Sequence, residues 1–154
     1  MNILIIADDE SDIQNLPECK VDLLNSCGDL PDSIIFQAAA RSSCQHILAV
    51  KGNHDSSGDF PEPIVNLHLK TFSFRGISFG GFCGSWKYKP RGNYLFEQFE
   101  VEALLAPFPK VDVFVAHNSP RQTHDQDDDV HTGFVAFTSY IQCHNPKVFL
   151  DRKS

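Results

Sequence analysis

The sequence predicts one layered α/β domain over residues 1–154, with central β-sheets flanked by helices. Short apolar runs alternate with a helical pattern, and each run ends in a polar cluster, as expected of strands in a parallel sheet. In the middle of the chain, alternating segments flank an Arg-Gly pair, which indicates an antiparallel hairpin. No repeat or linker divides the chain, and its length suits a single core.

The first half of the chain contains three predicted strands and one helix. Residues 3–7 are short, apolar and rich in β-branched side chains, and the runs 21–27 and 47–50 are similarly apolar. Such runs are typical of strands that are buried on both faces. After the second strand, Pro31-Asp32-Ser33 marks a helix start, and residues 34–41 with their alanine triplet form the helix.

The second half begins with the alternating segments 67–69, 72–74 and 77–79, which predict a hairpin around Arg75-Gly76. A loop rich in glycine, aromatic and basic residues follows, and apolar residues then recur at helical spacing. The predicted elements of this part are a loop over 80–94, a helix over 96–106, a strand over 111–116, an acidic loop over 125–129, a helix over 133–143 and a strand over 148–150.

Composition and charge exclude several classes of protein. No apolar stretch approaches the roughly 20 residues that span a bilayer, and the N-terminal residues lack the basic region of a secretory signal. The net charge of −7 disfavours nucleic acid as a partner and suits a protein that holds cations. The five cysteines, odd in number and without C-x-x-C spacing, predict free thiols. The expected location is therefore the cytoplasm, with no membrane partner.

Polar side chains follow four of the predicted strands. Asp8, Asp29, the pair Asn53-His54 and His117 each come just past the end of a strand. The carboxyl ends of strands in an open α/β sheet meet at one edge, so these groups can converge. Singly, each is more often a turn residue or a helix cap. Together they offer carboxylate, amide and imidazole ligands, which suit Mn²⁺, Fe or Zn²⁺.

The motifs Asp8-Asp9-Glu10, Gly28-Asp29, Gly52-Asn53-His54-Asp55 and His117 resemble, in order, those of the calcineurin-like metallophosphoesterases. The first motif is similar to that of a bacterial branch that reads Ala-Asp-x-Glu-Ser. The resemblance covers residues 3–150 and implies a metallophosphoesterase-type fold with two divalent metal ions. Mn²⁺ is the preferred metal, with Fe or Zn²⁺ as alternatives. It implies hydrolysis of a phosphomonoester or phosphodiester by a metal-bridging hydroxide, with a phosphorylated small molecule as the expected substrate.

The resemblance also implies a role for each motif residue. The implied metal ligands are Asp8, Glu10, Asp29, Asn53 and His117. Within this set Asp29 would bridge both ions, and Glu10 stands where most members have histidine. His54 would not bind metal but would face the leaving oxygen as proton donor or stabiliser, and Asp55 is grouped with it as catalytic.

Three further residues are candidates for substrate contact: Lys87, Arg91 and His131. Lys87 and Arg91 belong to the one dense positive patch of an acidic sequence, where aromatic and basic side chains alternate and could hold a base and a phosphate. A solvated turn is the equal alternative. His131 follows the acidic run 125–129, and a helix-start histidine is as good an interpretation. The run itself favours a solvated loop over an extra cation site.

The last motif of the family, Gly-His-x-His, is absent. Asp151-Arg152-Lys153-Ser154 follow the final strand, and basic side chains at that position would repel a cation. The sequence therefore predicts a C-terminally truncated fold. It leaves a second function open, that of an impaired or inactive member that binds metal or a phosphorylated ligand without efficient turnover. An exposed sheet edge would also permit an oligomer.

Overall fold

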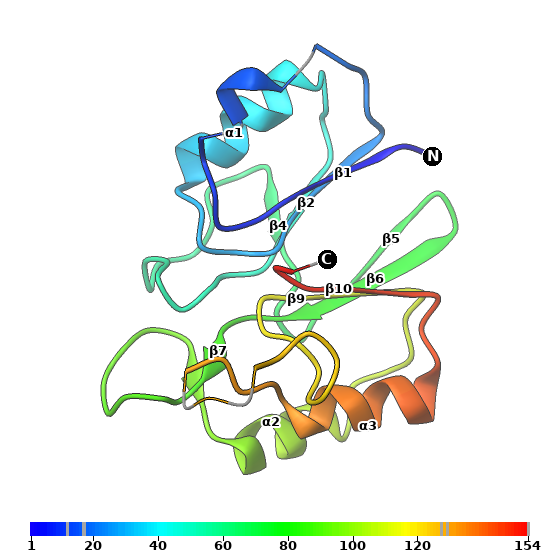
Figure 1. The fold of residues 1–154 in the computed structure, drawn as a ribbon. Coiled ribbons are helices and arrows are strands. Elements are labelled where there is room, and N and C mark those ends of the chain that lie inside the picture. The colour runs from blue at the N-terminus through cyan, green and yellow to red at the C-terminus, as the bar shows by residue number, and fades with distance from the viewer. Residues whose placement is uncertain (12, 17, 127, 129, 154) are drawn as a thin grey trace.

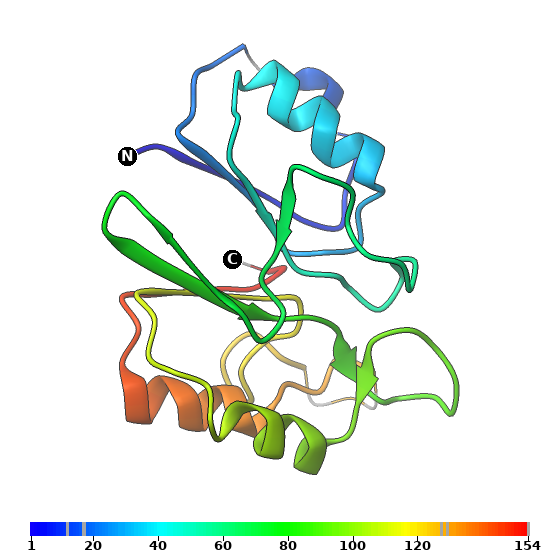
Figure 2. The same ribbon diagram turned by 180° about the vertical axis from the view of Figure 1, so that it is seen from behind.

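Two four-stranded sheets face each other, and helices cover their outer faces (Figures 1 and 2). The computed structural model describes residues 1–11, 13–16, 18–126, 128 and 130–153. The order of the layers is therefore helix, sheet, sheet, helix. The predicted α/β class with central sheets flanked by helices is confirmed.

The first sheet is parallel throughout and has the order β1-β2-β3-β4. Its strands are β1 (Ile3–Ile6), β2 (Leu23–Ser26), β3 (Ile47–Ala49) and β4 (Ile64–Asn66). A short 3-10 helix, η1 (Ile13–Asn15), and α1 (Asp32–Arg41) cover its outer face. Successive side chains of a strand point to opposite faces, so Leu24 packs toward α1 while Leu23 packs toward the second sheet.

The second sheet has the order β10-β9-β6-β5, and only its β5-β6 pair is antiparallel. Its strands are β5 (Thr71–Phe74), β6 (Ile77–Phe82), β9 (Val113–Ala116) and β10 (Val148–Leu150). The helices α2 (Gln98–Leu105) and α3 (Val135–His144) cover its outer face. The strands β7 (Ser85–Trp86) and β8 (Leu95–Phe96) form a separate small ribbon.

The hairpin turn between β5 and β6 is the one that the sequence predicts. Arg75 and Gly76 both adopt positive φ, at 49° and 78°. Two successive residues with positive φ are typical of a type I′ turn, whose twist matches that of the flanking strands. The pairing that results joins Phe74 to Ile77 and Phe72 to Phe79.

Several element boundaries differ from the sequence prediction, and β6 and β7 take up part of the loop predicted over 80–94. Residues 67–69 are not a strand. The strand β4 was not predicted, because its three residues directly follow Pro61-Glu62-Pro63 and give too short a pattern. The helix predicted over 96–106 begins at residue 98, since Glu97 and Glu100 form a reciprocal capping box there. His68, in the segment 67–69, is half-buried against the ring of Phe82 and accepts the Cys83 N–H at 3.0 Å.

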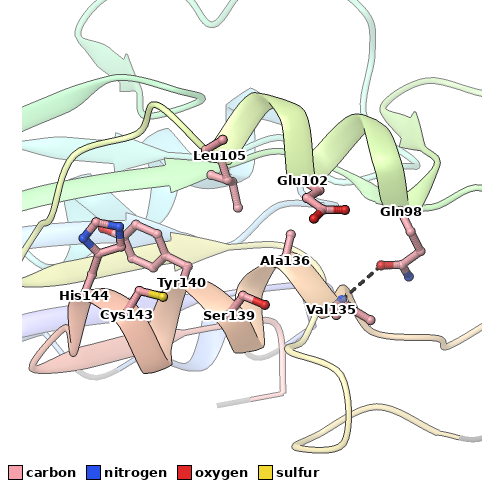
Figure 3. Close-up of a pocket in the computed structure, with 10 residues that line it drawn as sticks. Gln98, Glu102, Leu105, Val135, Ala136, Ser139, Tyr140, Cys143 and His144 are labelled. Atoms are coloured by element: carbon pink, nitrogen blue, oxygen red, sulfur yellow. Dashed lines mark hydrogen bonds between the residues drawn. The ribbon is translucent and has the colours of Figure 1, made fainter.

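A hollow of about 240 Å³ lies between α2 and α3 (Figure 3). At one end the Gln98 amide accepts the Val135 N–H at 3.0 Å and donates to the Gly133 carbonyl at 2.9 Å. At the other end the rings of Tyr140 and His144 stack with their centroids 4.5 Å apart. The Gln98 side chain thus satisfies the first amide of α3, and the hollow belongs to the contact between the two helices.

None of the helices that the structure describes is long and apolar enough to cross a membrane. The five cysteines are all free of disulfide bonds, and Cys27, Cys44 and Cys83 are buried in the core. Burial raises the pKa of the Cys27 and Cys83 thiols to about 12. Both therefore serve as small apolar core residues rather than as reactive thiolates.

Asp112 should make the stability of the second sheet depend on pH. Its carboxylate accepts the Ser78 amide at 2.9 Å and pairs with Lys147 at 2.9 Å, and these contacts hold its pKa well below the usual range. A pKa that is lower in the folded state stabilises the fold above about pH 4, and this contribution is lost as the pH falls. We expect Asp112→Asn to lower the melting temperature at neutral pH and the difference from the natural protein to shrink below about pH 4. Thermal melts across this range test it, and a difference that is constant with pH would contradict it.

Candidate metal centre

The carboxyl ends of β1, β2, β3 and β9 meet where the two sheets adjoin, and polar residues follow each of these strands. The ligand atoms of Asp8, Asp29 and His117 all lie within 4.8 Å of one another. Asp8 and Asp29 follow β1 and β2 of the first sheet, whereas His117 follows β9 of the second. The cluster therefore joins the two sheets, as expected of a site at strand ends.

The backbone at both aspartates is strained. Asp8 and Asp29 have φ of 58° and 57°, in the left-handed region that non-glycine residues seldom adopt. Gly28 precedes Asp29 with φ of 95°, and its carbonyl accepts the Asp8 N–H at 3.2 Å. Left-handed residues cost about 1–3 kcal/mol each and cluster at functional sites. Here the turns aim two carboxylates from neighbouring strands at one point.

His117 is completely buried and presents one ring nitrogen to the cluster. Its Nδ1 lies 2.8 Å from the Cys27 carbonyl, which can only accept, so Nδ1 carries the hydrogen. Its Nε2 lies 3.2 Å from Asn53 Oδ1 and 3.4 Å from Asp29 Oδ2. When Nε2 is unprotonated, its lone pair and two oxygens face one another, and a cation placed among them is stabilised by all three. When Nε2 is protonated, its N–H donates to these oxygens instead.

Asn53 is held by two residues of the glycine-rich loop. Ser85 Oγ donates to Asn53 Oδ1 at 2.7 Å, and Asn53 Nδ2 donates to the Tyr88 hydroxyl at 3.3 Å. These bonds leave the amide oxygen directed at His117. Sequence reasoning missed both Ser85 and Tyr88, because it looked in this loop for positive charge rather than for hydroxyl groups.

Asp55 orients the loop after β3. Its buried Oδ2 accepts the Gly52 N–H at 2.7 Å and the Asp29 N–H at 3.0 Å, and so links two of the strand-end turns. Burial raises the pKa of Asp55, although these two amide bonds oppose the rise. The carboxylate that the sequence grouped with His54 as catalytic thus faces backbone amides.

His117 and the surrounding protein set the charge states of the two aspartates. Burial alone would raise the pKa of Asp29, but the hydrogen bond and charge of His117, with the His54 N–H at 2.8 Å, bring it below the usual value. Burial raises the pKa of Asp8 and the nearby Asp29 adds to the rise, while His117 and Arg152 oppose it. Two carboxylates that crowd each other in this way favour a bound cation.

Gly52 gives the donor atoms their room. A Cβ at this position would overlap Asp29 Oδ1 and lie 2.7 Å from the His117 ring carbon Cε1. Only glycine lets the β3 loop pass this close to both side chains. The set of donors, one amide, one imidazole and two carboxylates around a backbone without a side chain, fits Mn²⁺, Fe or Zn²⁺.

Two other motif residues lie at the edge of the cluster. Glu10 is exposed, and its carboxylate is not in the group formed by Asp8, Asp29 and His117. Glu10 does line one shallow hollow together with Asp8 and Asp29. His54 is exposed and lines a neighbouring hollow of about 380 Å³ with Asp29. Its backbone N–H donates to Asp29 Oδ1 at 2.8 Å, and its charge is among the influences that lower the pKa of both aspartates.

The three candidate substrate residues are not brought into the cluster. Lys87 is exposed and pairs with Glu97 at 3.3 Å, and Arg91 is exposed in the same loop. His131 pairs with Asp128 at 2.8 Å, which lowers the pKa of that carboxyl to about 2. Among the residues that the structure describes, no hydrogen bond or ion pair joins any of the three to Asp8, Asp29 or His117.

In the acidic run 125–129, the described residue Asp125 makes its contacts with neighbouring residues of the same loop. Asp125 pairs with Arg121 at 3.0 Å and accepts the Gln122 amide at 2.7 Å. Asp127 and Asp129 lie outside the described residues. Asp128 is exposed, as expected of a solvated loop, whereas the side chain of Asp125 is largely buried.

Comparison with known proteins identifies similar folds. No protein-family model and no curated protein matches the chain. The crystal structure of TT1561 of Thermus thermophilus is 17% identical, with a TM-score of 0.64 over 97% of this chain and 80% of that one. A second solved structure is 15% identical, with a TM-score of 0.60 over 97% of this chain and 82% of that one. At this identity the likeness bears on the fold.

Proposed function

We propose that this protein is a metal-dependent phosphoesterase whose centre is formed by Asp8, Asp29, Asn53 and His117. The observation that carries the proposal is the convergence of Asp8, Asp29 and His117, whose ligand atoms lie within 4.8 Å of one another. Mn²⁺ is the first candidate cation, with Fe and Zn²⁺ as alternatives. The five cysteines without disulfide bonds support action in the cytoplasm.

The residues around the cluster have separate tasks in the proposed reaction. A bound divalent cation would supply polarisation of a phosphate oxygen and a water of lowered pKa. Asp29, Asn53 and His117 would hold that cation. Asp55 accepts the Asp29 N–H and Ser85 donates to the Asn53 amide oxygen, so these two residues orient their neighbours. His54 is exposed beside Asp29, where its imidazole is available to give a proton to the leaving oxygen.

A second function, binding of metal or a phosphorylated ligand without efficient turnover, is favoured by a different observation. The structure describes one cluster of three His, Cys, Asp or Glu ligands, and Glu10 is not part of it. The expected second cation would therefore have few protein ligands in the described residues. A centre with one well-held cation would activate water less strongly than a pair of ions.

The first experiment measures hydrolysis of p-nitrophenyl phosphate and bis(p-nitrophenyl) phosphate by the full chain, after treatment with a chelator and then with Mn²⁺ added back. Turnover that appears with Mn²⁺ and disappears with the chelator is the expected result. Mn²⁺ binding, followed by electron paramagnetic resonance, is measured on the same samples. Tight binding without turnover would favour the second function, and absence of both would refute the proposal.

A further inference from the structure

The segment after β10 lies beside the candidate metal centre. The parallel register pairs Leu150 with Val115, so the next residues run alongside His117, and the Arg152 N–H donates to the His117 carbonyl at 3.4 Å. In Figures 1 and 2 this end of the chain lies between the two sheets. Arg152 therefore reaches the same strand-end edge as Asp8 and Asp29.

Neighbouring contacts fix the backbone of this segment. Asp151 is buried, pairs with His124 Nδ1 at 3.0 Å and accepts the Lys153 N–H at 2.8 Å. Lys153 in turn donates from Nζ to the His124 carbonyl at 3.0 Å. Because Asp151 and Lys153 are both held by these contacts, the backbone position of Arg152 is fixed.

The backbone of Arg152 brings a positive charge to the strand-end edge that carries His117. Burial raises the pKa of Asp8, and the charge of Arg152 is among the influences that oppose the rise. Arg152 is half-exposed, and no hydrogen bond or ion pair within the described part of the chain occupies its side chain at contact distance. Its five N–H donors are therefore available to a ligand at this edge, in a fork that matches two oxygens of a phosphate.

We infer that Arg152 binds the phosphoryl group of the substrate beside the metal and makes the centre select phosphate monoesters over diesters. A monoester has three terminal oxygens, so the fork can take two of them and leave the third for the cation. A diester has only two, and the fork and the cation then compete for them. This inference rests on the proposed function and gives its substrate class.

The test compares the natural protein with Arg152→Ala and Arg152→Lys. The control is Arg75→Ala, which removes the same charge at the hairpin turn, where Arg75 pairs with Asp22. Orthophosphate binding is measured by calorimetry with and without Mn²⁺, and Mn²⁺ binding by electron paramagnetic resonance. Rates with p-nitrophenyl phosphate and bis(p-nitrophenyl) phosphate are measured on the same samples.

Orthophosphate should bind about tenfold to a hundredfold more weakly to Arg152→Ala, since one charged, hydrogen-bonded contact is lost. Mn²⁺ affinity should be unchanged or higher, because a repelling charge has gone. Arg152→Lys keeps the charge without the fork, so it should recover part of the orthophosphate affinity while the preference for the monoester still falls. The Arg75 variant should resemble the natural protein in every measurement.

Several outcomes would overturn the inference. They are unchanged orthophosphate affinity in Arg152→Ala, an equal loss in the Arg75 control, or a monoester preference that survives in Arg152→Lys. Should Arg152→Ala fail to fold, the lysine variant decides. If the natural protein hydrolyses neither ester, the phosphoesterase proposal fails, yet the orthophosphate titrations still decide whether Arg152 binds phosphate.

Discussion

Asp29→Asn should reduce Mn²⁺-dependent hydrolysis to background, a loss of about a thousandfold or more. Asp29 lies 3.4 Å from His117 Nε2 and receives the His54 N–H at 2.8 Å, so it is the carboxylate most closely joined to the rest of the cluster. Asparagine retains an oxygen for that amide but removes the charge that attracts a cation. The readouts are Mn²⁺ affinity and the rates with both esters.

Asparagine suits this test better than alanine because Asp29 has φ of 57°. Asparagine tolerates the left-handed region, whereas alanine would add a backbone cost of about 1–2 kcal/mol that is unrelated to metal. The matched control is Asp59→Asn, which makes the same change in an exposed loop. Mn²⁺-dependent turnover that survives in Asp29→Asn would show that the centre lies elsewhere.

Gly52→Ala is expected to weaken Mn²⁺ binding by about tenfold to a hundredfold, as the loss of a ligand's support does. The added methyl would overlap Asp29 Oδ1, and neither neighbour can move freely. The Asp29 oxygen already accepts the His54 N–H, and the His117 ring is held by the Cys27 carbonyl at 2.8 Å. The free energy of unfolding should also fall by about 1–3 kcal/mol, since the site becomes overpacked.

Gly58→Ala is the matched control for this change. No atom lies within 4 Å of a Cβ built at Gly58, so its stability and Mn²⁺ affinity should match those of the natural protein. Calorimetric titration with Mn²⁺ and a thermal melt give both quantities for each variant. Equal Mn²⁺ affinity in Gly52→Ala and Gly58→Ala would contradict the packing described around Asp29.

Strong periodicity made most of the fold predictable. The apolar runs that became β1, β2, β3 and β9 are continuous and bounded by polar turns, and the Arg75-Gly76 pair specifies its turn locally. The short strands β4, β7 and β8 were not predicted. With two or three residues each, they owe their pairing to neighbours distant in sequence, which no local pattern encodes.

The sequence by itself determined which side chains follow the strands. Asp8, Asp29, Asn53 and His117 are polar residues that come just past the carboxyl ends of buried strands. Only the tertiary structure decided which groups meet. It brought His117 to Asp29 from the other sheet, left Glu10, Lys87 and His131 outside the cluster, and added Ser85, Tyr88 and Arg152. The physical reason is that strand order and loop path fix distances between residues far apart in sequence, whereas sequence pattern fixes only the local conformation.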